Sequence, residues 1–135
     1  MMRALLDSHI LLWALTGDER LPQGARDIIL DADNTIYYSA ASVWELAIKH
    51  ALHPESITIS AAELMDLCGK AGFVQLHVKG DHAATIDSLT RDPSAKPHKD
   101  PFDRMLIAQA KYEGMAFVTH DSLLPAYNEP CIEFV

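Results

Sequence analysis

The sequence predicts an α/β protein in which helices cover both faces of a central, mainly parallel sheet. Segments that favour strands alternate with amphipathic segments almost throughout the 135 residues. The candidate strands are short and apolar, as is typical of strands that are buried on both faces. Hydrophobic residues make up 49% of the chain and its mean hydropathy is +0.01. We therefore expect one globular domain, residues 1–135, with a core of its own.

The first half of the chain contains two predicted strands and three predicted helices. "NTIYYSA" has the β-branched and aromatic residues that strands favour. His53-Pro54 is expected to end a helix, because the residue before proline avoids helical backbone angles. The predicted strands cover 3–7 and 34–40, and the predicted helices cover 8–15, 22–33 and 42–52.

The second half continues the alternation. Ser60 and Glu63 have the spacing of a helix-capping box. Asp100 suits an N-cap, Pro101 the first helical position and Gly114 a helix exit. The loop 90–101 is rich in proline and lysine. We predict helices over 60–72, 80–89 and 101–114, a short helical turn over 121–127, and strands over 73–78, 115–120 and 131–135.

Charge and composition exclude several classes of protein. Lys and Arg total 11 against 19 Asp and Glu, a net charge of −8 that argues against a large basic groove for nucleic acid. It still allows an enzyme that meets RNA through a metal ion and a small basic patch. Cys68 and Cys131 share no motif, so we expect reduced thiols in a cytoplasmic protein. The N-terminus lacks a cleavage signal, and no apolar run approaches membrane-spanning length.

Acidic residues recur where predicted strands give way to helices. Asp7 ends the first strand, and Asp121 follows the strand 115–120. Glu45 is expected in the first turn of the helix after the second strand. Strand-to-helix turns of a parallel sheet share its carboxyl edge, where ligands bind, so these three side chains should gather there. Asp103 opens a helix reached by a long loop, so the pattern fixes its place less firmly.

Each acid also has a local interpretation as a helix cap. Asp7 and Asp121 can be N-caps, Ser42 and Glu45 have capping-box spacing, and Asp103 falls at the third helical position. Taken together, gathered carboxylates repel one another unless their pKa values rise or a cation neutralises them. Oxygen ligands without a Cys or His set suit Mg²⁺ or Mn²⁺. Such an ion activates water and clamps phosphate, as phosphodiester hydrolysis requires.

Four motifs resemble those of a known family. "LLDSHILLW", "SAASVWELAIK", "DPFDRMLIAQA" and "FVTHD" are similar to the acidic motifs of PIN-domain ribonucleases, in particular the VapC-type toxins of type II toxin–antitoxin pairs. The resemblance spans essentially the whole chain in order. It implies a three-layer α/β/α fold and an RNA endonuclease that depends on Mg²⁺, with Mn²⁺ as a substitute. By position, Asp7 and Asp103 would be the primary metal ligands, with Glu45 and Asp121 completing the cluster.

The resemblance also implies partners. It predicts an RNA substrate, a homodimer, and a separate antitoxin chain that occludes the site. It predicts contact with DNA only through that antitoxin, and none with a membrane. The helices beside the acidic turns carry Trp13 and Trp44. We expect both in the core, with a place in an apolar antitoxin groove as the alternative.

Several residues near the acids are candidate substrate contacts. Ser8 and Thr119 carry hydroxyl groups that can bond a carboxylate or the scissile phosphate; otherwise they are ordinary helix and strand residues. Arg104 can contact phosphate, or it can pair with an acid such as Asp100. His120 adjoins Asp121 and is expected to be a surface histidine.

The loop before the helix 101–114 is the densest basic stretch in this acidic chain. It either contacts the RNA backbone or is an ordinary solvated loop. The stretch consists of Arg91, Lys96, His98 and Lys99. Lys96 and Lys99 are the candidate contacts that a salt titration with RNA would test.

Two other functions compete with nuclease activity. One is a PIN-like module that binds RNA or protein without catalysis and whose acids only cap helices. The other is a phosphatase or phosphotransferase in which Asp7 is the nucleophile. "DSHI" lacks a second Asp two residues after Asp7, which argues against the haloacid-dehalogenase type of phosphatase.

Overall fold

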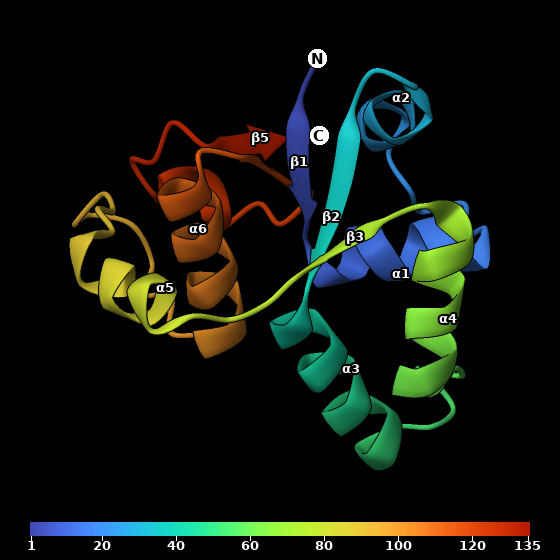
Figure 1. The fold of residues 1–135 in the computed structure, drawn as a ribbon. Helices are drawn as coiled ribbons and strands as arrows, with labels where there is room; N and C mark the ends of the chain where they lie inside the picture. The colour runs from blue at the N-terminus through green and yellow to red at the C-terminus, as the bar shows by residue number, and fades with distance from the viewer.

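A five-stranded sheet forms the centre of the molecule, with the strand order β3-β2-β1-β4-β5 (Figure 1). The structure is a computed structural model that describes residues 1–135. Every pair of neighbouring strands is parallel, so the prediction of a mainly parallel sheet is confirmed. The strands are β1 (Arg3–Leu6), β2 (Thr35–Ser39), β3 (Val74–Leu76), β4 (Ala116–Thr119) and β5 (Ile132–Phe134).

Helices cover both faces of this sheet. Each predicted helix is present, although α2 stops three residues early and the turn predicted over 121–127 is helical only at η2. The helices are α1 (Ser8–Thr16), α2 (Gln23–Leu30), α3 (Ala40–Leu52), α4 (Ala61–Ala71), α5 (Gly80–Thr85) and α6 (Pro101–Glu113), with 3₁₀ turns η1 (Ile86–Ser88) and η2 (Leu124–Ala126). None of them is both long enough and apolar enough to cross a membrane.

The central strand separates two apolar clusters. Side chains alternate along a strand, so Ala4 and Leu6 of β1 face one layer and Leu5 faces the other. Ala4 and Leu6 pack in the cluster that contains residues of α1 to α4. Leu5 packs with Leu106 and Phe117 in the cluster built largely on α6 and β4. All five side chains are fully buried, which fixes the sheet between two helical layers.

The carboxyl edge of the sheet is where β1, β2 and β4 lead toward helices. In Figure 1, β1 and β2 run downward and α3 begins at the lower end of β2. Leu6 lies opposite Val118, and the amide of Asp7 donates to the carbonyl of Val118 over 2.9 Å. The pairing of β1 with β4 therefore extends one residue beyond β1 and holds the backbone of Asp7 in place.

The start of α3 differs from the prediction. The helix begins at Ala40, two residues early, because the Ser39 hydroxyl accepts the Ala41 amide over 3.0 Å and acts as N-cap. Ser42 is therefore inside the helix, and the capping box predicted for Ser42 and Glu45 is wrong. Glu45 lies in the second turn rather than the first, and its side chain is buried.

Two other helix starts agree with the sequence. Ser60 and Glu63 form both bonds of a capping box at α4. At α6, one oxygen of Asp100 accepts the amides of Phe102 and Asp103 over 2.9 and 3.2 Å. Asp100 is thus the N-cap of α6, which leaves the Asp103 carboxylate available for other contacts.

Candidate metal centre

The four predicted acids come from four different elements. Asp7 follows β1, Glu45 lies on α3, Asp103 on the first turn of α6, and Asp121 two residues after β4. The charges of Asp7, Glu45 and Asp121 all raise the pKa of Asp103, which shows that the four carboxylates share one neighbourhood. The topology of the sheet thus brings the motifs together at its carboxyl edge.

Asp7 is the most deeply placed of these acids. It is 4% exposed, and the Thr119 hydroxyl donates to its Oδ2 over 2.7 Å. Asp7 is the N-cap residue of α1 by position, as the capping interpretation predicted, but its side chain makes no capping bond to the helix. Burial raises its pKa, against the lowering effect of the Thr119 bond. A buried carboxylate with a single hydroxyl partner favours either a proton or a cation.

Glu45 is held by both of its oxygens. The Ser8 hydroxyl donates to Oε1 and the Lys49 ammonium donates to Oε2, each over 2.7 Å. Ser8 also lies 2.8 Å from the hydroxyl of Ser42. Ser8 therefore contacts a carboxylate of the cluster, and Lys49 offsets part of its charge.

The pKa of Asp103 is raised well above its usual value. Its side chain is 13% exposed. Burial, and then the charges of Asp7, Asp100, Glu45 and Asp121, raise its pKa to about 8. At neutral pH without a cation, this carboxyl group is therefore largely protonated.

Asp121 combines a local role with a place beside the cluster. Its Oδ1 accepts the amide of Leu123 over 2.9 Å and stabilises the turn before η2, but the N-cap of η2 is Leu123, whereas the capping interpretation had predicted Asp121. The Thr119 hydroxyl accepts the amide of Asp121 over 3.1 Å while it donates to Asp7. Thr119 therefore links the backbone of one acid to the side chain of another.

A histidine that we had assigned to the basic loop lies inside this site. His98 places Nε2 3.1 Å from Oδ2 of Asp103 and Nδ1 2.8 Å from the Tyr127 hydroxyl. Burial lowers its pKa, and the charge of Asp121 opposes this shift. The sequence carries one signal for this placement: His98 lies five positions before Asp103 and two before the motif "DPFDRMLIAQA".

The basic residues around the site divide into two kinds. Arg91 and Arg104 are half-buried, and each has an Nε without a hydrogen-bond partner. Arg104 forms no salt bridge, so its predicted pairing with Asp100 is wrong. Lys96 and Lys99 are exposed on the loop, as expected both for a solvated segment and for an RNA contact.

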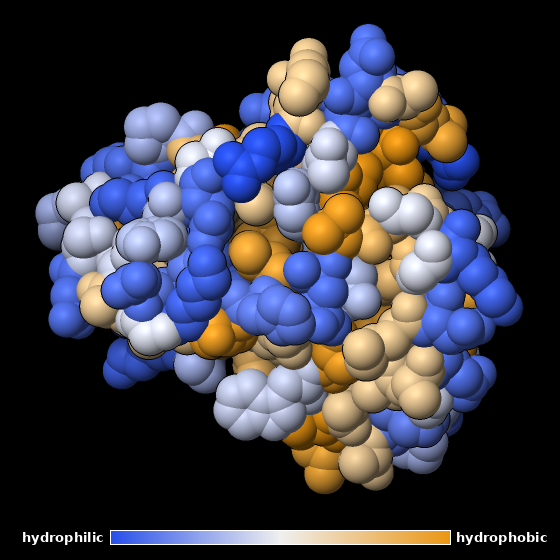
Figure 2. Space-filling model, viewed as in Figure 1, coloured by the Kyte–Doolittle hydropathy of each residue, from blue (hydrophilic) through white to orange (hydrophobic).

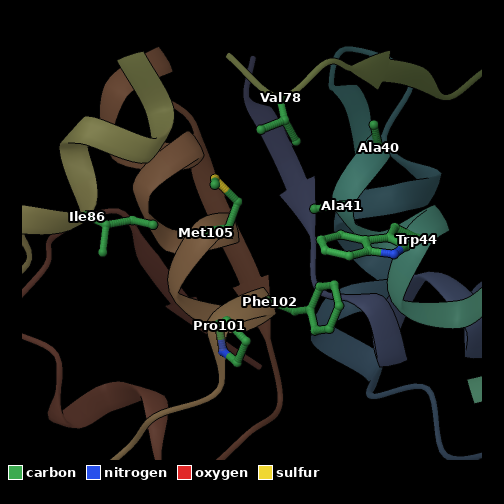
Figure 3. A pocket seen from close by; sticks show the side chains of 8 residues that line it. All are labelled: Ala40, Ala41, Trp44, Val78, Ile86, Pro101, Phe102 and Met105. Atoms are coloured by element: carbon green, nitrogen blue, oxygen red, sulfur yellow. The ribbon is translucent and has the colours of Figure 1, made fainter. Parts of the chain in front are cut away.

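An apolar pocket of about 370 Å³ lies between α3 and α6. Figure 3 shows Trp44 of α3 facing Phe102 of α6, with Met105 and Ile86 on the far side; the two aromatic rings meet edge to face at 5.0 Å. Apolar atoms come to the surface in the middle of the face shown in Figure 2. Trp44 is 65% exposed, so its prediction as a core residue is wrong. Trp13 is half-buried and packs against the core.

The remaining expectations concern side chains outside the cluster. Cys68 and Cys131 are free thiols, as predicted. His120 is exposed, also as predicted; its Nδ1 contacts the carbonyl of Val135 and its ring stacks on Phe134.

The donor set fits a hard divalent cation. Four carboxylates offer oxygen atoms to such a cation, and two of them, Asp7 and Glu45, are buried at 4% exposure. Mg²⁺ and Mn²⁺ bind such carboxylate sets. The fold and the site together define a class: an α/β protein with a carboxylate centre at the edge of a parallel sheet, suited to a divalent cation.

Comparison with known proteins identifies the family within this class. A family model described as PIN domain matches residues 4–129. The chain therefore belongs to the PIN-domain family, and the family assignment made from the four motifs is confirmed.

Individual relatives agree with this assignment. The chain is 33% identical to Ribonuclease VapC22 of Mycobacterium tuberculosis over 131 residues, which are 96% of this chain and 95% of the relative. Two solved structures share the fold. VapBC2 from Rickettsia felis bound to a promoter DNA fragment has a TM-score of 0.68 at 14% identity, covering 99% of this chain and 98% of that one. DNA-bound VapBC from Salmonella typhimurium has a TM-score of 0.66 at 16% identity, with the same coverage.

Proposed function

We propose that this protein is the toxin of a type II toxin–antitoxin pair and hydrolyses RNA as an endoribonuclease in the cytoplasm. The observation that carries this proposal is the convergence of Asp7, Glu45, Asp103 and Asp121, with the Asp103 pKa raised to about 8. Relatedness to a ribonuclease over nearly the full length of both chains supports it.

We propose Asp7 and Asp103 as the primary ligands of Mg²⁺, which Mn²⁺ can replace, and Glu45 and Asp121 as the acids that complete the centre. A bound cation supplies positive charge for the phosphate and activates water near neutral pH.

The other polar contacts in the site keep these acidic side chains in place. Thr119 orients Asp7, while Ser8 and Lys49 hold the two oxygens of Glu45.

The reaction that suits this centre is attack of water on phosphorus in line with the leaving oxygen. The bond from phosphorus to O3′ breaks, which leaves a 5′-phosphate and a 3′-hydroxyl.

We propose Arg104, Lys96 and Lys99 as contacts to the RNA phosphates. Arg104 has an unpartnered Nε near the cluster, and the two lysines are exposed on the adjoining loop. Ser8 and Thr119 are better suited to holding carboxylates than to binding substrate directly.

We propose that a separate antitoxin chain covers the acidic edge and the apolar pocket beside it, and that the toxin forms a homodimer. Contact with DNA would come only through the antitoxin. The exposed Trp44 and its neighbour Phe102 give an aromatic anchor of the kind that dominates protein interfaces. Trp44→Ala should weaken the complex with co-expressed antitoxin at least about tenfold, since anchors contribute 2 kcal/mol or more. An unchanged affinity would place the antitoxin elsewhere.

The experiment that tests the activity is cleavage of total RNA by the purified, antitoxin-free protein. It compares Mg²⁺ or Mn²⁺ with EDTA, and wild type with Asp7→Asn and with Lys70→Gln, a matched surface control on α4. We expect metal-dependent cleavage by the wild type and Lys70→Gln, and none by Asp7→Asn. Metal binding without cleavage of any RNA would favour a binding module. A phosphorylated Asp7 would favour the phosphatase.

A further inference from the structure

His98 brings a nitrogen atom into the acidic cluster. Its side chain is only 5% exposed although it lies on the loop that precedes α6. His98, Asp103 and Asp121 each offer one ligand atom to a group whose atoms all lie within 4.8 Å of one another. Within this group, Nε2 of His98 lies 3.1 Å from Oδ2 of Asp103. An ordinary loop histidine would turn its ring toward water. This ring contacts the Asp103 carboxylate and the Tyr127 hydroxyl instead.

The separations in this group match those of atoms bound to one ion. Neighbouring ligands of an octahedral ion with bonds near 2.1 Å are about 3.0 Å apart, and opposite ligands are about 4.2 Å apart. His98 Nε2 and Asp103 Oδ2 are 3.1 Å apart. Only the longest separation, at most 4.8 Å, needs to close slightly. The three residues therefore lie close enough together for one cation to contact a ligand atom from each.

The other nitrogen of His98 has the partner that a metal-binding histidine requires. Histidine ligands use their second ring nitrogen to donate to an oxygen that fixes the tautomer and the ring orientation. Nδ1 of His98 lies 2.8 Å from the Tyr127 hydroxyl, and the two rings meet at 89°. With the proton on Nδ1 donated to Tyr127, Nε2 presents its lone pair to the cluster.

Tyr127 is itself firmly placed. The guanidinium of Arg91 lies 5.3 Å from the centre of its ring, and Arg91 and Tyr127 form an isolated antiparallel bridge. The amide of Asp92 donates to the carbonyl of Ala126 over 2.8 Å. The loop that carries His98 is therefore tied to the segment that carries Tyr127, and the His98 ring is held before any ion binds.

We propose that Nε2 of His98 is a direct nitrogen ligand of the cation in this centre, beside Asp103 and Asp121, with Tyr127 as the residue that positions it. This inference rests on the proposed metal centre and deepens it, because it assigns the ion's ligands. Imidazole favours first-row transition ions, whereas Mg²⁺ prefers oxygen alone. The centre should therefore bind Mn²⁺ in clear preference to Mg²⁺.

Electron spin echo spectroscopy of the Mn²⁺-loaded full-length protein tests the bond directly. A bound imidazole adds nitrogen modulation to the Mn²⁺ echo, and labelling all histidines with ¹⁵N changes the modulation without any substitution. We expect nitrogen modulation in the wild type and in His120→Asn, a control at an exposed histidine near Asp121. We expect its loss in His98→Asn. A wild-type echo without nitrogen modulation would overturn the proposal.

Calorimetric titration with Mn²⁺ and with Mg²⁺ gives the second readout. His98→Asn should lose at least about tenfold in Mn²⁺ affinity and less in Mg²⁺ affinity, with Tyr127→Phe between it and the wild type. Equal losses for both ions would mean that His98 only positions Asp103, and would overturn the proposal. If His98→Asn binds Mn²⁺ as tightly as the wild type, oxygen ligands alone hold the ion. That outcome would overturn the proposal for His98 and leave the proposed nuclease function intact. Failure of the wild type to bind either ion would instead refute the metal centre itself.

Discussion

At the scale of single residues, the carboxylates of the centre are held by hydroxyl groups rather than by positive charges. Thr119 and Ser8 each donate to one acid over 2.7 Å, and only Glu45 has an ammonium partner. Hydroxyl donors orient a carboxylate without neutralising it, which is compatible with the cation proposed for the cluster. This arrangement suits a site that binds a metal ion better than one that caps helices.

Thr119→Val should destabilise the metal-free protein by about 1–3 kcal/mol, because it leaves the buried Asp7 carboxylate and the Asp121 amide without their shared partner. Urea denaturation in EDTA measures the free energy of unfolding. Thr119→Ser keeps the hydroxyl and is the matched control, which should recover most of the loss. Equal destabilisation by both variants would assign the effect to packing.

Asp103→Asn should stabilise the metal-free protein at pH 8. The folded-state pKa of about 8 lies above the usual value, so ionisation of Asp103 costs stability as pH rises from about 4 to 8. The advantage of Asn should therefore be greatest above pH 8 and vanish near pH 4, and it should exceed about 1 kcal/mol, the value of one pKa unit. Denaturation curves across this range check the prediction. A variant that is less stable at pH 8 would support a purely structural role for Asp103.

At the scale of elements, the residue that caps each helix N-terminus decides which acidic side chains remain available for the proposed metal centre. Asp100 accepts two amides of α6, so Asp103 is not needed as a cap. Ser39 caps α3, which puts Glu45 one turn deeper than we predicted. Because Asp100 and Ser39 cap the two helices, the side chains of Asp103 and Glu45 can take part in the acidic cluster.

The cap of α6 can be tested with a pair of variants. Asp100→Ala should cost about 1 kcal/mol more stability than Asp100→Asn, because both remove the charge but only Asn keeps a capping oxygen. Thermal or urea unfolding without metal measures the difference. Equal stabilities would show that the hydrogen bonds to Phe102 and Asp103 contribute little.

The order and type of the elements followed from the sequence, because apolar periodicity and cap residues are local signals. The convergence of Asp7 and Asp121 could be predicted from the parallel topology. The places of His98 and Trp44 could not. His98 is buried by its contacts with Tyr127, which lies 29 positions away, and Trp44 is exposed because α3 turns that side toward the pocket rather than the core. Both depend on packing between distant segments, which no local pattern encodes.

At the scale of the whole molecule, an acidic protein with net charge −8 is proposed to bind an acidic polymer. Affinity for RNA must then come from a few local contacts and the cation. Replacing Lys96 and Lys99 with Gln should lower the slope of log K against log salt by about 1.4, since each contact to single-stranded nucleic acid contributes roughly 0.7. Filter binding at several salt concentrations, with Lys70→Gln as control, measures the slope. An unchanged slope would make the loop an ordinary solvated segment.

The pairing of β1 with β4 has a consequence for how the protein is made. The central strand, at residues 3–6, has to wait for Ala116 to Thr119 before it gains its second neighbour. Asp103 and Asp121 join Asp7 only through that late pairing. A ribosome that has released three quarters of the chain therefore holds a nascent polypeptide in which Asp7 still lacks its bonds to Val118 and Thr119 and in which Asp121 has not yet been made. The proposed nuclease activity is therefore expected only after the last quarter of the chain has been made, which leaves an interval in which the proposed antitoxin can bind the emerging chain.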